Sequence, residues 1–200
     1  MSGQYGDIIL VHGDNLLSDI IQNLTNSFFA HAALCTEPGK IAEMNRFGFQ
    51  YHDNHYLSGS RPFIVLRHFS LFPNNPRALY HINLIRNCIE NYRKNPPRYD
   101  YFEILNQALK LILSRGDHLT RDGEAYISAN LLYAASERLI CSALIDTVYE
   151  AAGIDLFPGR TSKHTTPADI ASLSTGPNRT LIVVYQSPGV LKATEGTENG

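Results

Sequence analysis

The sequence predicts an α+β fold in one domain, with a small antiparallel sheet packed against helices. Short apolar runs of strand length, separated by turn signals, fill much of the first third of the chain. Apolar residues at helical spacing follow between 76 and 114 and again after residue 141. The chain has 200 residues, enough for one domain to bury an apolar core without support from a metal or a disulfide.

The chain opens with a predicted strand and a predicted helix. Residues 6–11 form an apolar run that we expect to be a strand buried on both faces. Residues 15–24 then carry apolar side chains at helical spacing, which predicts a short helix.

Two further strands carry the residues of most interest in this half of the chain. The small apolar run at 27–34 predicts a second strand, and the turn signal at 37–40 leads into a third at 41–45. His31 and Glu43 therefore fall on two strands that we expect to pair.

Residues 63–68 alternate in polarity and predict another strand, whereas 48–60 are rich in Gly, His and Tyr and predict a loop that borders a cleft. A break at 73–76 precedes a helix for which Asn75 is the expected cap. The apolar face of this helix is formed by Ala78, Ile82, Ile85, Ile89 and Tyr92.

The second half of the chain is predicted to be mainly helical. A break at 95–100 precedes a helix with one apolar stripe over 101–112, and 116–123 read as a polar loop. A further helix is expected to begin at Cys141 and to end at Gly153.

A last strand is predicted at 180–185, and 187–200 contain few apolar residues and many small or polar ones. This composition predicts a flexible tail at 187–200 after a single domain at 1–186.

The composition excludes several classes of function. Hydrophobic residues make up 44% and charged residues 18%, and the formal net charge of -2 lacks the basic excess typical of nucleic-acid binding. The longest apolar runs, at 7–11 and 181–185, are far shorter than the about 20 residues of a membrane-spanning helix. The start of the chain has neither a basic segment nor an apolar core, so we expect no cleavable signal peptide and a cytoplasmic protein in the producing cell.

Cys141 is the candidate nucleophile. It lies between a short apolar run and a stretch with helical spacing, and the free N–H groups of a helix's first turn favour a thiolate. The N–H groups of Cys141 and Ser142 are the corresponding candidate donors for an oxyanion. A cysteine hydrolase also needs a histidine and a polar group that orients it, and His31 and Glu43 are our candidates.

Each of these residues also has a structural interpretation. Cys141 could be an ordinary buried thiol, His31 a core histidine bonded to backbone, and Glu43 a strand residue paired with Lys40. Cys35 lies on the same strand face as His31 and is a rival nucleophile, but it lacks a helix start.

Metal and disulfide chemistry are not predicted. The chain has three widely spaced cysteines, Cys35, Cys88 and Cys141, which indicates reduced thiols. The run His52-Asp53-Asn54-His55 does not have the spacing of a zinc enzyme, so we expect neither a metal nor another cofactor.

Four motifs occur in an informative order: Gly-Asp-Ile-Ile-Leu at 6–10, Phe-Ala-His-Ala-Ala-Leu at 29–34, Gly-Lys-Ile-Ala-Glu at 39–43 and Ile-Cys-Ser-Ala-Leu-Ile at 140–145. Their order resembles the circularly permuted branch of the NlpC-type papain-like cysteine hydrolases, which includes YiiX-like and lecithin-retinol-acyltransferase-like enzymes. In ordinary papain-like enzymes the cysteine precedes the histidine, and here the order is reversed, as in the permuted branch.

The resemblance implies a permuted papain-like fold in which Cys141 is the nucleophile, His31 the base and Glu43 the third residue. Asp7, Asp14 and Asn45 remain alternatives for the third residue. The segment Tyr99-Asp100-Tyr101 resembles one that borders the active site in YiiX-like proteins, and it could equally serve helix capping and packing.

The function that the resemblance implies is hydrolysis of an amide bond through a thioester, with peptidoglycan stem peptides as the leading substrate. Because that substrate lies outside the cytoplasm, the enzyme would be a delivered antibacterial effector with an immunity protein as partner, or be released by lysis. The alternatives are an acyltransferase, thioesterase or lipid hydrolase that uses the same Cys–His site, and a non-catalytic binding module.

Overall fold

The computed structural model describes residues 3–12, 28–45, 47–97, 119–121, 124–126, 129–160 and 165–190. These residues form a mixed α+β fold, as the sequence predicted. The helix expected at 15–24, the stripe at 101–112 and the segment 99–101 lie outside the described residues.

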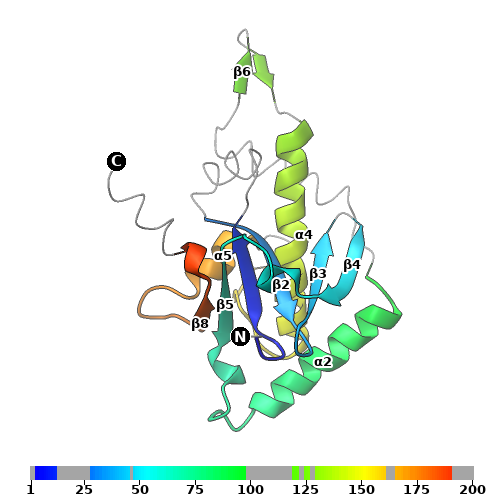
Figure 1. Cartoon of the computed structure of the whole chain (residues 1–200), viewed down its shortest axis with the longest axis vertical. Coiled ribbons are helices and arrows are strands. Elements are labelled where there is room, and N and C mark those ends of the chain that lie inside the picture. The colour runs from blue at the N-terminus through cyan, green and yellow to red at the C-terminus, as the bar shows by residue number, and fades with distance from the viewer. Residues whose placement is uncertain are drawn as a thin grey trace.

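Six strands form one antiparallel sheet in the order β4-β3-β2-β1-β5-β8 (Figure 1). Their bounds are Ile8–His12 for β1, Phe29–Cys35 for β2, Lys40–Asn45 for β3, Gly48–Asp53 for β4, Phe63–His68 for β5 and Leu181–Gln186 for β8. The predicted strands at 6–11, 27–34, 41–45, 63–68 and 180–185 are confirmed within a few residues. The predicted pairing of the strands that carry His31 and Glu43 is also confirmed.

The loop prediction for residues 48–60 is wrong over most of its length. Gly48–Asp53 form the edge strand β4, and His55–Leu57 form a short 3₁₀ helix, η1. The side chain of Asn54 caps η1 by accepting a hydrogen bond from the N–H of Tyr56 at 3.1 Å. The segment therefore returns along β3 instead of leaving the sheet.

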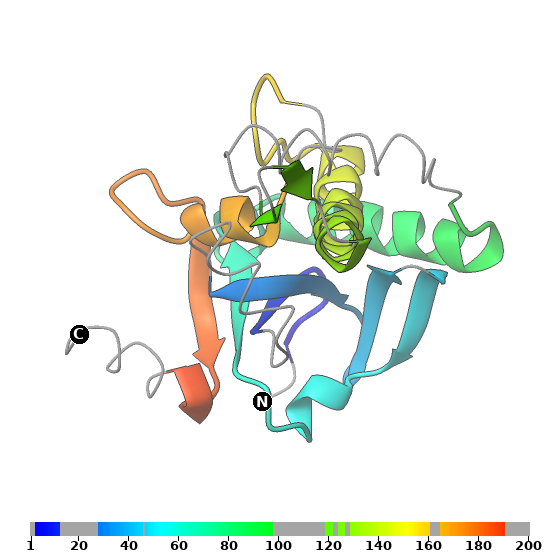
Figure 2. The ribbon, with the colours of Figure 1, turned by 90° about the horizontal axis from the view of Figure 1, so that it is seen from above.

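Three described helices cover the same face of the sheet (Figure 2). They are α2 at Ala78–Lys94, α4 at Ala129–Ala151 and α5 at Pro167–Ser172. A second 3₁₀ helix, η2 at Phe69–Leu71, follows β5, and β6 at Leu119–Arg121 pairs with β7 at Glu124–Tyr126 in a small separate hairpin. The hairpin places strand residues inside the stretch 116–123, which the sequence predicted to be a loop.

The sheet is buried on both faces near its centre, as predicted for residues 6–11. Ile8 and Leu10 join a large apolar core with α2 and α4, whereas Ile9 and Val11 join a smaller cluster on the opposite face. All four side chains are at most 1% exposed. Strand alternation explains this division, because successive side chains point to opposite faces.

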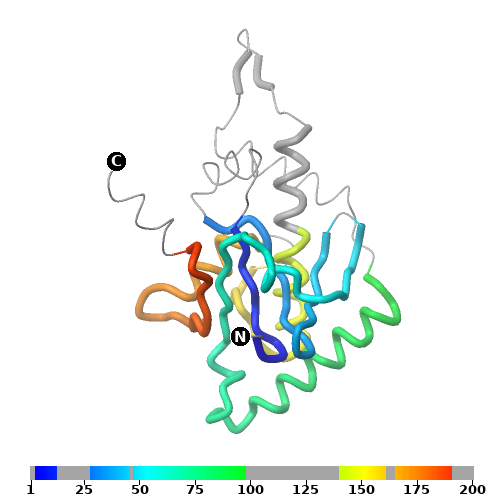
Figure 3. The backbone as a smooth tube through the Cα atoms, viewed as in Figure 1, coloured from blue at the N-terminus to red at the C-terminus, as the bar shows by residue number. Residues whose placement is uncertain are grey.

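Helix α4 begins well before Cys141, so the predicted helix start at that residue is wrong. The helix runs from Ala129 to Ala151, and its end just before Gly153 agrees with the prediction. The part of α4 that carries Cys141 packs against β2 and β3, and Figure 3 shows it behind these strands. Cys141 therefore lies in the interior of the helix.

Two smaller predictions also need correction. The N-cap of α2 is Arg77, and Asn75 instead accepts a hydrogen bond from the N–H of Arg77 at 2.9 Å, one turn before the helix. The first residues of the predicted tail are packed: Ser187 is buried, its Oγ accepts a hydrogen bond from the N–H of Phe63 at 2.8 Å, and Val190 joins the core.

A buried ion pair fixes the start of β1. The carboxylate of Asp7 accepts hydrogen bonds from Nε and Nη2 of Arg67 at 2.7 and 2.8 Å, and from the N–H of Gln4 at 2.7 Å. The Tyr149 hydroxyl of α4 donates to the Gly6 carbonyl at 2.6 Å. These contacts join β1 to β5 and α4.

In the described part of the chain, no helix is both long enough and apolar enough to span a membrane.

Candidate active site

His31 and Glu43 meet where β2 and β3 separate. The two strands pair at Leu34↔Ala42 and Cys35↔Ile41, at the turn end of the hairpin. Beyond these pairs, Nε2 of His31 contacts Oε2 of Glu43 at 3.0 Å. The side chain of His31 is 22% exposed and that of Glu43 is 8% exposed, so the contact is largely shielded from water.

Cys141 completes the group from the helical layer. Its side chain forms a hydrogen bond with the His31 ring. Because Nε2 of His31 is occupied by Glu43, Nδ1 is the ring nitrogen that remains for the sulfur. The structure thus brings the side chains of Cys141, His31 and Glu43 into one interacting group.

Two residues that sequence reasoning did not assign to the site hold the Glu43 carboxylate. The Tyr56 hydroxyl donates to Oε2 at 2.9 Å, and Nε2 of His52 contacts Oε1 at 3.1 Å. Both oxygens of Glu43 are therefore occupied. The placement of Glu43 opposite Gln50 in the β3–β4 ladder brings His52, two residues further along β4, within reach.

The interactions within the site raise the pKa of His31 and lower the pKa of Glu43. Burial alone would lower the pKa of His31, but the charge of Cys141 and hydrogen bonds to Cys141 and Glu43 raise it to about 10. Burial alone would raise the pKa of Glu43, but the hydrogen bond and charge of His31, with the hydrogen bonds of Tyr56 and His52, lower it to about 2. Burial and the Glu43 charge raise the pKa of Tyr56, so its hydroxyl stays a donor.

These shifts define the pH range in which the pair stabilises the fold. The raised pKa of His31 contributes stability that is fully present below pH 6.5 and is lost as the pH rises through about 10. The lowered pKa of Glu43 contributes stability that is present above pH 4.5 and is lost as the pH falls through about 2. Between these limits the carboxylate faces an imidazolium.

The proposed oxyanion donors lose their structural basis. The prediction for the N–H groups of Cys141 and Ser142 depended on a helix start, and both residues lie inside α4. Inside a regular α-helix each N–H donates to the carbonyl four residues earlier, so these groups have partners already. Cys141 and Ser142 are also both 0% exposed.

The alternatives for the third residue and for the nucleophile lie elsewhere or have other partners. Asp7 is bound to Arg67, and Oδ1 of Asn45 accepts a hydrogen bond from the N–H of Phe47 at 2.8 Å, while Asp14 lies outside the described residues. Cys35 belongs to the smaller apolar cluster, where burial and the charge of Asp7 raise the pKa of its thiol to about 12.

The side chains of the run 52–55 make other contacts in the structure. Within the described ranges, no three His, Cys, Asp or Glu residues are placed to hold a metal ion. His52 contacts Glu43, and the ring of His55 lies tilted against that of Tyr56 with centroids 4.1 Å apart. Polar and aromatic residues alternate from Phe49 onwards. This alternation is typical of a half-buried strand and is the sequence signal for the strand that carries His52.

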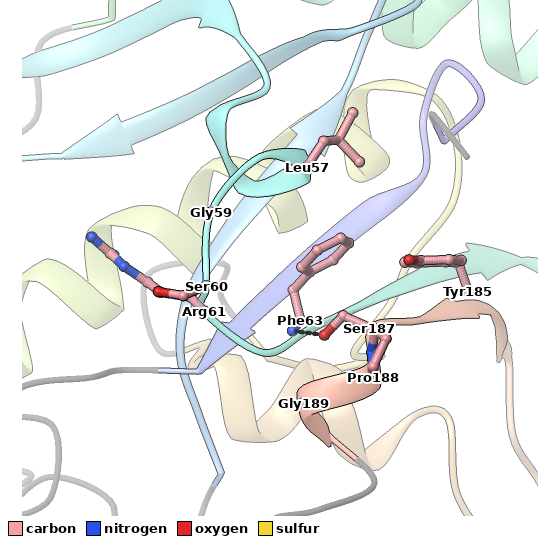
Figure 4. Close-up of a pocket in the computed structure, with 9 residues that line it drawn as sticks. All are labelled: Leu57, Gly59, Ser60, Arg61, Phe63, Tyr185, Ser187, Pro188 and Gly189. Carbon is pink, nitrogen blue, oxygen red and sulfur yellow. Dashed lines mark hydrogen bonds between the residues drawn. The ribbon is translucent and has the colours of Figure 1, made fainter.

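A pocket of about 260 Å³ lies beside η1. Figure 4 shows its lining: Leu57, Gly59, Ser60, Arg61, Phe63, Tyr185, Ser187, Pro188 and Gly189. The rings of Phe63 and Tyr185 form an apolar wall, with centroids 5.6 Å apart, and the guanidinium of Arg61 points away from it (Figure 4). Its volume is below the roughly 300–1,000 Å³ of sites that bury a drug-sized ligand, so it has room for one side chain or a short acyl group.

No protein-family model matches the sequence, and a search of curated proteins finds no match. The function must therefore be inferred from the site itself and from the resemblance of its motifs.

Proposed function

We propose that the protein is a cysteine hydrolase in which Cys141 is the nucleophile, His31 the acid–base and Glu43 the residue that orients His31. The observation that carries this proposal is that the His31 ring interacts with both other residues, through Nε2 with Glu43 and through a hydrogen bond with the Cys141 side chain. This arrangement supplies a nucleophile, a proton carrier and an orienting anion from three different elements.

In the first step the Cys141 sulfur attacks the carbonyl carbon of an amide and forms a C–S bond. The imidazolium of His31 then gives its Nδ1 proton to the amide nitrogen as the C–N bond breaks, so the amine leaves neutral. Glu43 stays ionised throughout and stabilises the imidazolium before this transfer. The product of this step is a thioester on Cys141.

In the second step His31 acts as a base. It takes a proton from water while the water oxygen attacks the thioester carbonyl, and the C–S bond breaks to release a carboxylic acid. His31 keeps the proton taken from water and the sulfur leaves as a thiolate, which restores the starting pair.

For the substrate we propose an amide bond in peptidoglycan stem peptides, a choice supported by the motif resemblance. An enzyme with that substrate acts outside the cytoplasm, so delivery to a target periplasm and a neutralising immunity protein belong to the same proposal. Acyl substrates are the alternative, since the same thioester chemistry serves an acyltransferase, thioesterase or lipid hydrolase.

The test is mass spectrometry of purified peptidoglycan fragments after incubation with the wild-type protein, with Cys141→Ala and with His31→Ala. New fragments made only by the wild type are expected, and their masses identify the bond. If all three proteins leave the fragments intact, the peptidoglycan substrate is wrong, and acyl substrates are tested with the same three proteins.

The reactivity of Cys141 separates an enzyme from a non-catalytic module. Cys141 and Cys35 are at most 3% exposed, so substrate reaches Cys141 only when the residues that cover it move. We expect iodoacetamide at pH 7 to alkylate Cys141 about tenfold faster than Cys35, because Cys141 interacts with the His31 ring while burial keeps Cys35 protonated. Peptide mapping by mass spectrometry measures both rates in one sample.

The matched control is His31→Ala, which removes the imidazolium and is expected to slow alkylation of Cys141 but not of Cys35. Equal resistance of both thiols in the folded protein, with equal labelling after unfolding, would support the binding module instead.

A further inference from the structure

His52 has an unusual pair of partners. On one side its Nδ1 lies 2.9 Å from the backbone carbonyl oxygen of Asp53, and on the other its Nε2 lies 3.1 Å from Oε1 of Glu43. A carbonyl oxygen and an ionised carboxylate can only accept hydrogen bonds. A neutral imidazole carries one N–H, so it can satisfy only one of these partners.

The ionised state of Glu43 determines which protonation state of His52 fits both contacts. The carboxylate already receives hydrogen bonds from Tyr56 and His31 on Oε2, and its pKa is about 2, so it has no proton to offer His52. Both nitrogens of His52 must therefore donate. The contacts that the structure contains require the doubly protonated, positively charged ring.

The His52 ring contacts Oε1 of Glu43, whereas His31 contacts Oε2. Strands β3 and β4 lie side by side at the edge of the sheet (Figure 1), and His52 and Gln50 share one face of β4. A donor on Oε1 fixes the rotation of the Glu43 carboxylate, which leaves Oε2 directed at Nε2 of His31. If the Nε2 proton of His52 is lost, two lone pairs face each other at 3.1 Å and the carboxylate turns away.

We propose that His52 is a positioning residue, which in its doubly protonated form holds Oε1 of Glu43 so that Oε2 stays on His31 and His31 stays in place for Cys141. This inference rests on the proposed function. It implies that a donor at position 52 that does not titrate keeps this support at any pH. The other ionisable groups around His52 come from β2, β3, β4 and η1: His31, Lys40, Glu43, Asp53, His55 and Tyr56.

The test compares two replacements of His52. Gln at this position can place its amide nitrogen near the position of Nε2, donates to Glu43 and does not titrate, whereas Ala donates nothing. We expect His52→Ala to slow alkylation of Cys141 by about tenfold at pH 7. His52→Gln is expected to keep most of the reactivity and to extend it to higher pH than in the wild type. Gln50→Ala, on the same strand face, is the matched control and is expected to leave the pH profile unchanged.

A second measurement reads the His52 ring directly. Nitrogen-15 NMR of the wild-type protein at pH 7, with the His52 signal assigned by its loss in His52→Gln, is expected to show protons on both ring nitrogens. A neutral ring, or a pH profile of Cys141 alkylation that is the same in the wild type and in both variants, would overturn the inference. Failure to cleave any substrate would overturn the proposed function instead, because alkylation and the NMR signal need no substrate.

Discussion

Under the proposed mechanism, replacing both Cys141 and His31 with alanine is expected to reduce hydrolysis no further than replacing either one alone. Each single variant should lose roughly 10⁴- to 10⁶-fold in rate, because the thiolate and its proton carrier act as one unit and neither works without the other. The basis of this expectation is that the His31 ring interacts with both Cys141 and Glu43. Rates are measured on the substrate that the wild type cleaves, at several enzyme concentrations.

Cys35→Ala is the control for this experiment. Cys35 is a buried cysteine on the same strand as His31, and it lies in the smaller apolar cluster, away from α4. Its replacement should leave the rate close to that of the wild type. Losses at Cys141 and His31 that multiply in the double variant, or a Cys141→Ala variant that stays active, would show that the two residues do not form a catalytic unit.

Arg67→Ala is expected to lower the free energy of unfolding by about 3–5 kcal/mol, because it leaves the Asp7 carboxylate buried without its partner. Asp7 is 0% exposed, and Arg67 reaches it with two hydrogen bonds of 2.7 and 2.8 Å. Urea denaturation followed by circular dichroism measures the change, and the slope of the transition shows whether unfolding stays cooperative.

Two further variants show whether burial causes the effect. Lys40→Ala breaks an exposed ion pair with Asp53 and is expected to leave the midpoint almost unchanged. The double variant Asp7→Asn, Arg67→Gln removes both charges and should be less destabilised than the sum of its single variants. A wild-type midpoint for Arg67→Ala would mean that Asp7 gains access to water and that the ion pair contributes nothing.

The strands that sequence patterns predicted are those with one clear apolar run. Residues 8–12 and 63–68 are of this kind, since most of their side chains are buried. Strand β4 was missed because nearly all of its residues are only half-buried and its apolar side chains, Phe49 and Tyr51, are aromatic ones between polar neighbours. Its alternation is real, but Gly48 and the histidine-rich segment that follows gave a stronger signal for a loop.

The start of α4 was misplaced for a different reason. The residues before Cys141 contain neither proline nor glycine back to Gly123, and alanine and leucine among them favour a helix. The short apolar run at 138–140 was interpreted as a separate element because helix and strand cannot be distinguished over so few residues. The same error gave Cys141 and Ser142 their predicted role as oxyanion donors.

The sequence patterns named three candidate site residues but not the two residues that hold Glu43. His31, Glu43 and Cys141 lie in short motifs whose order is informative. Tyr56 and His52 come close to Glu43 only through the β3–β4 ladder and the turn into η1, and no local pattern specifies such a diagonal contact.

The interacting group Cys141–His31–Glu43 also limits when fast Cys141 alkylation can arise during folding. The strand that carries His31 and the helix that carries Cys141 are separated in the chain by five strands and α2, so their meeting closes a long loop. Contacts of such long sequence separation form slowly, after local hairpins such as β3–β4 are available. A freshly synthesised or partly refolded chain would thus lack the contact between Cys141 and His31. The appearance of fast Cys141 alkylation would then report when the native fold is complete.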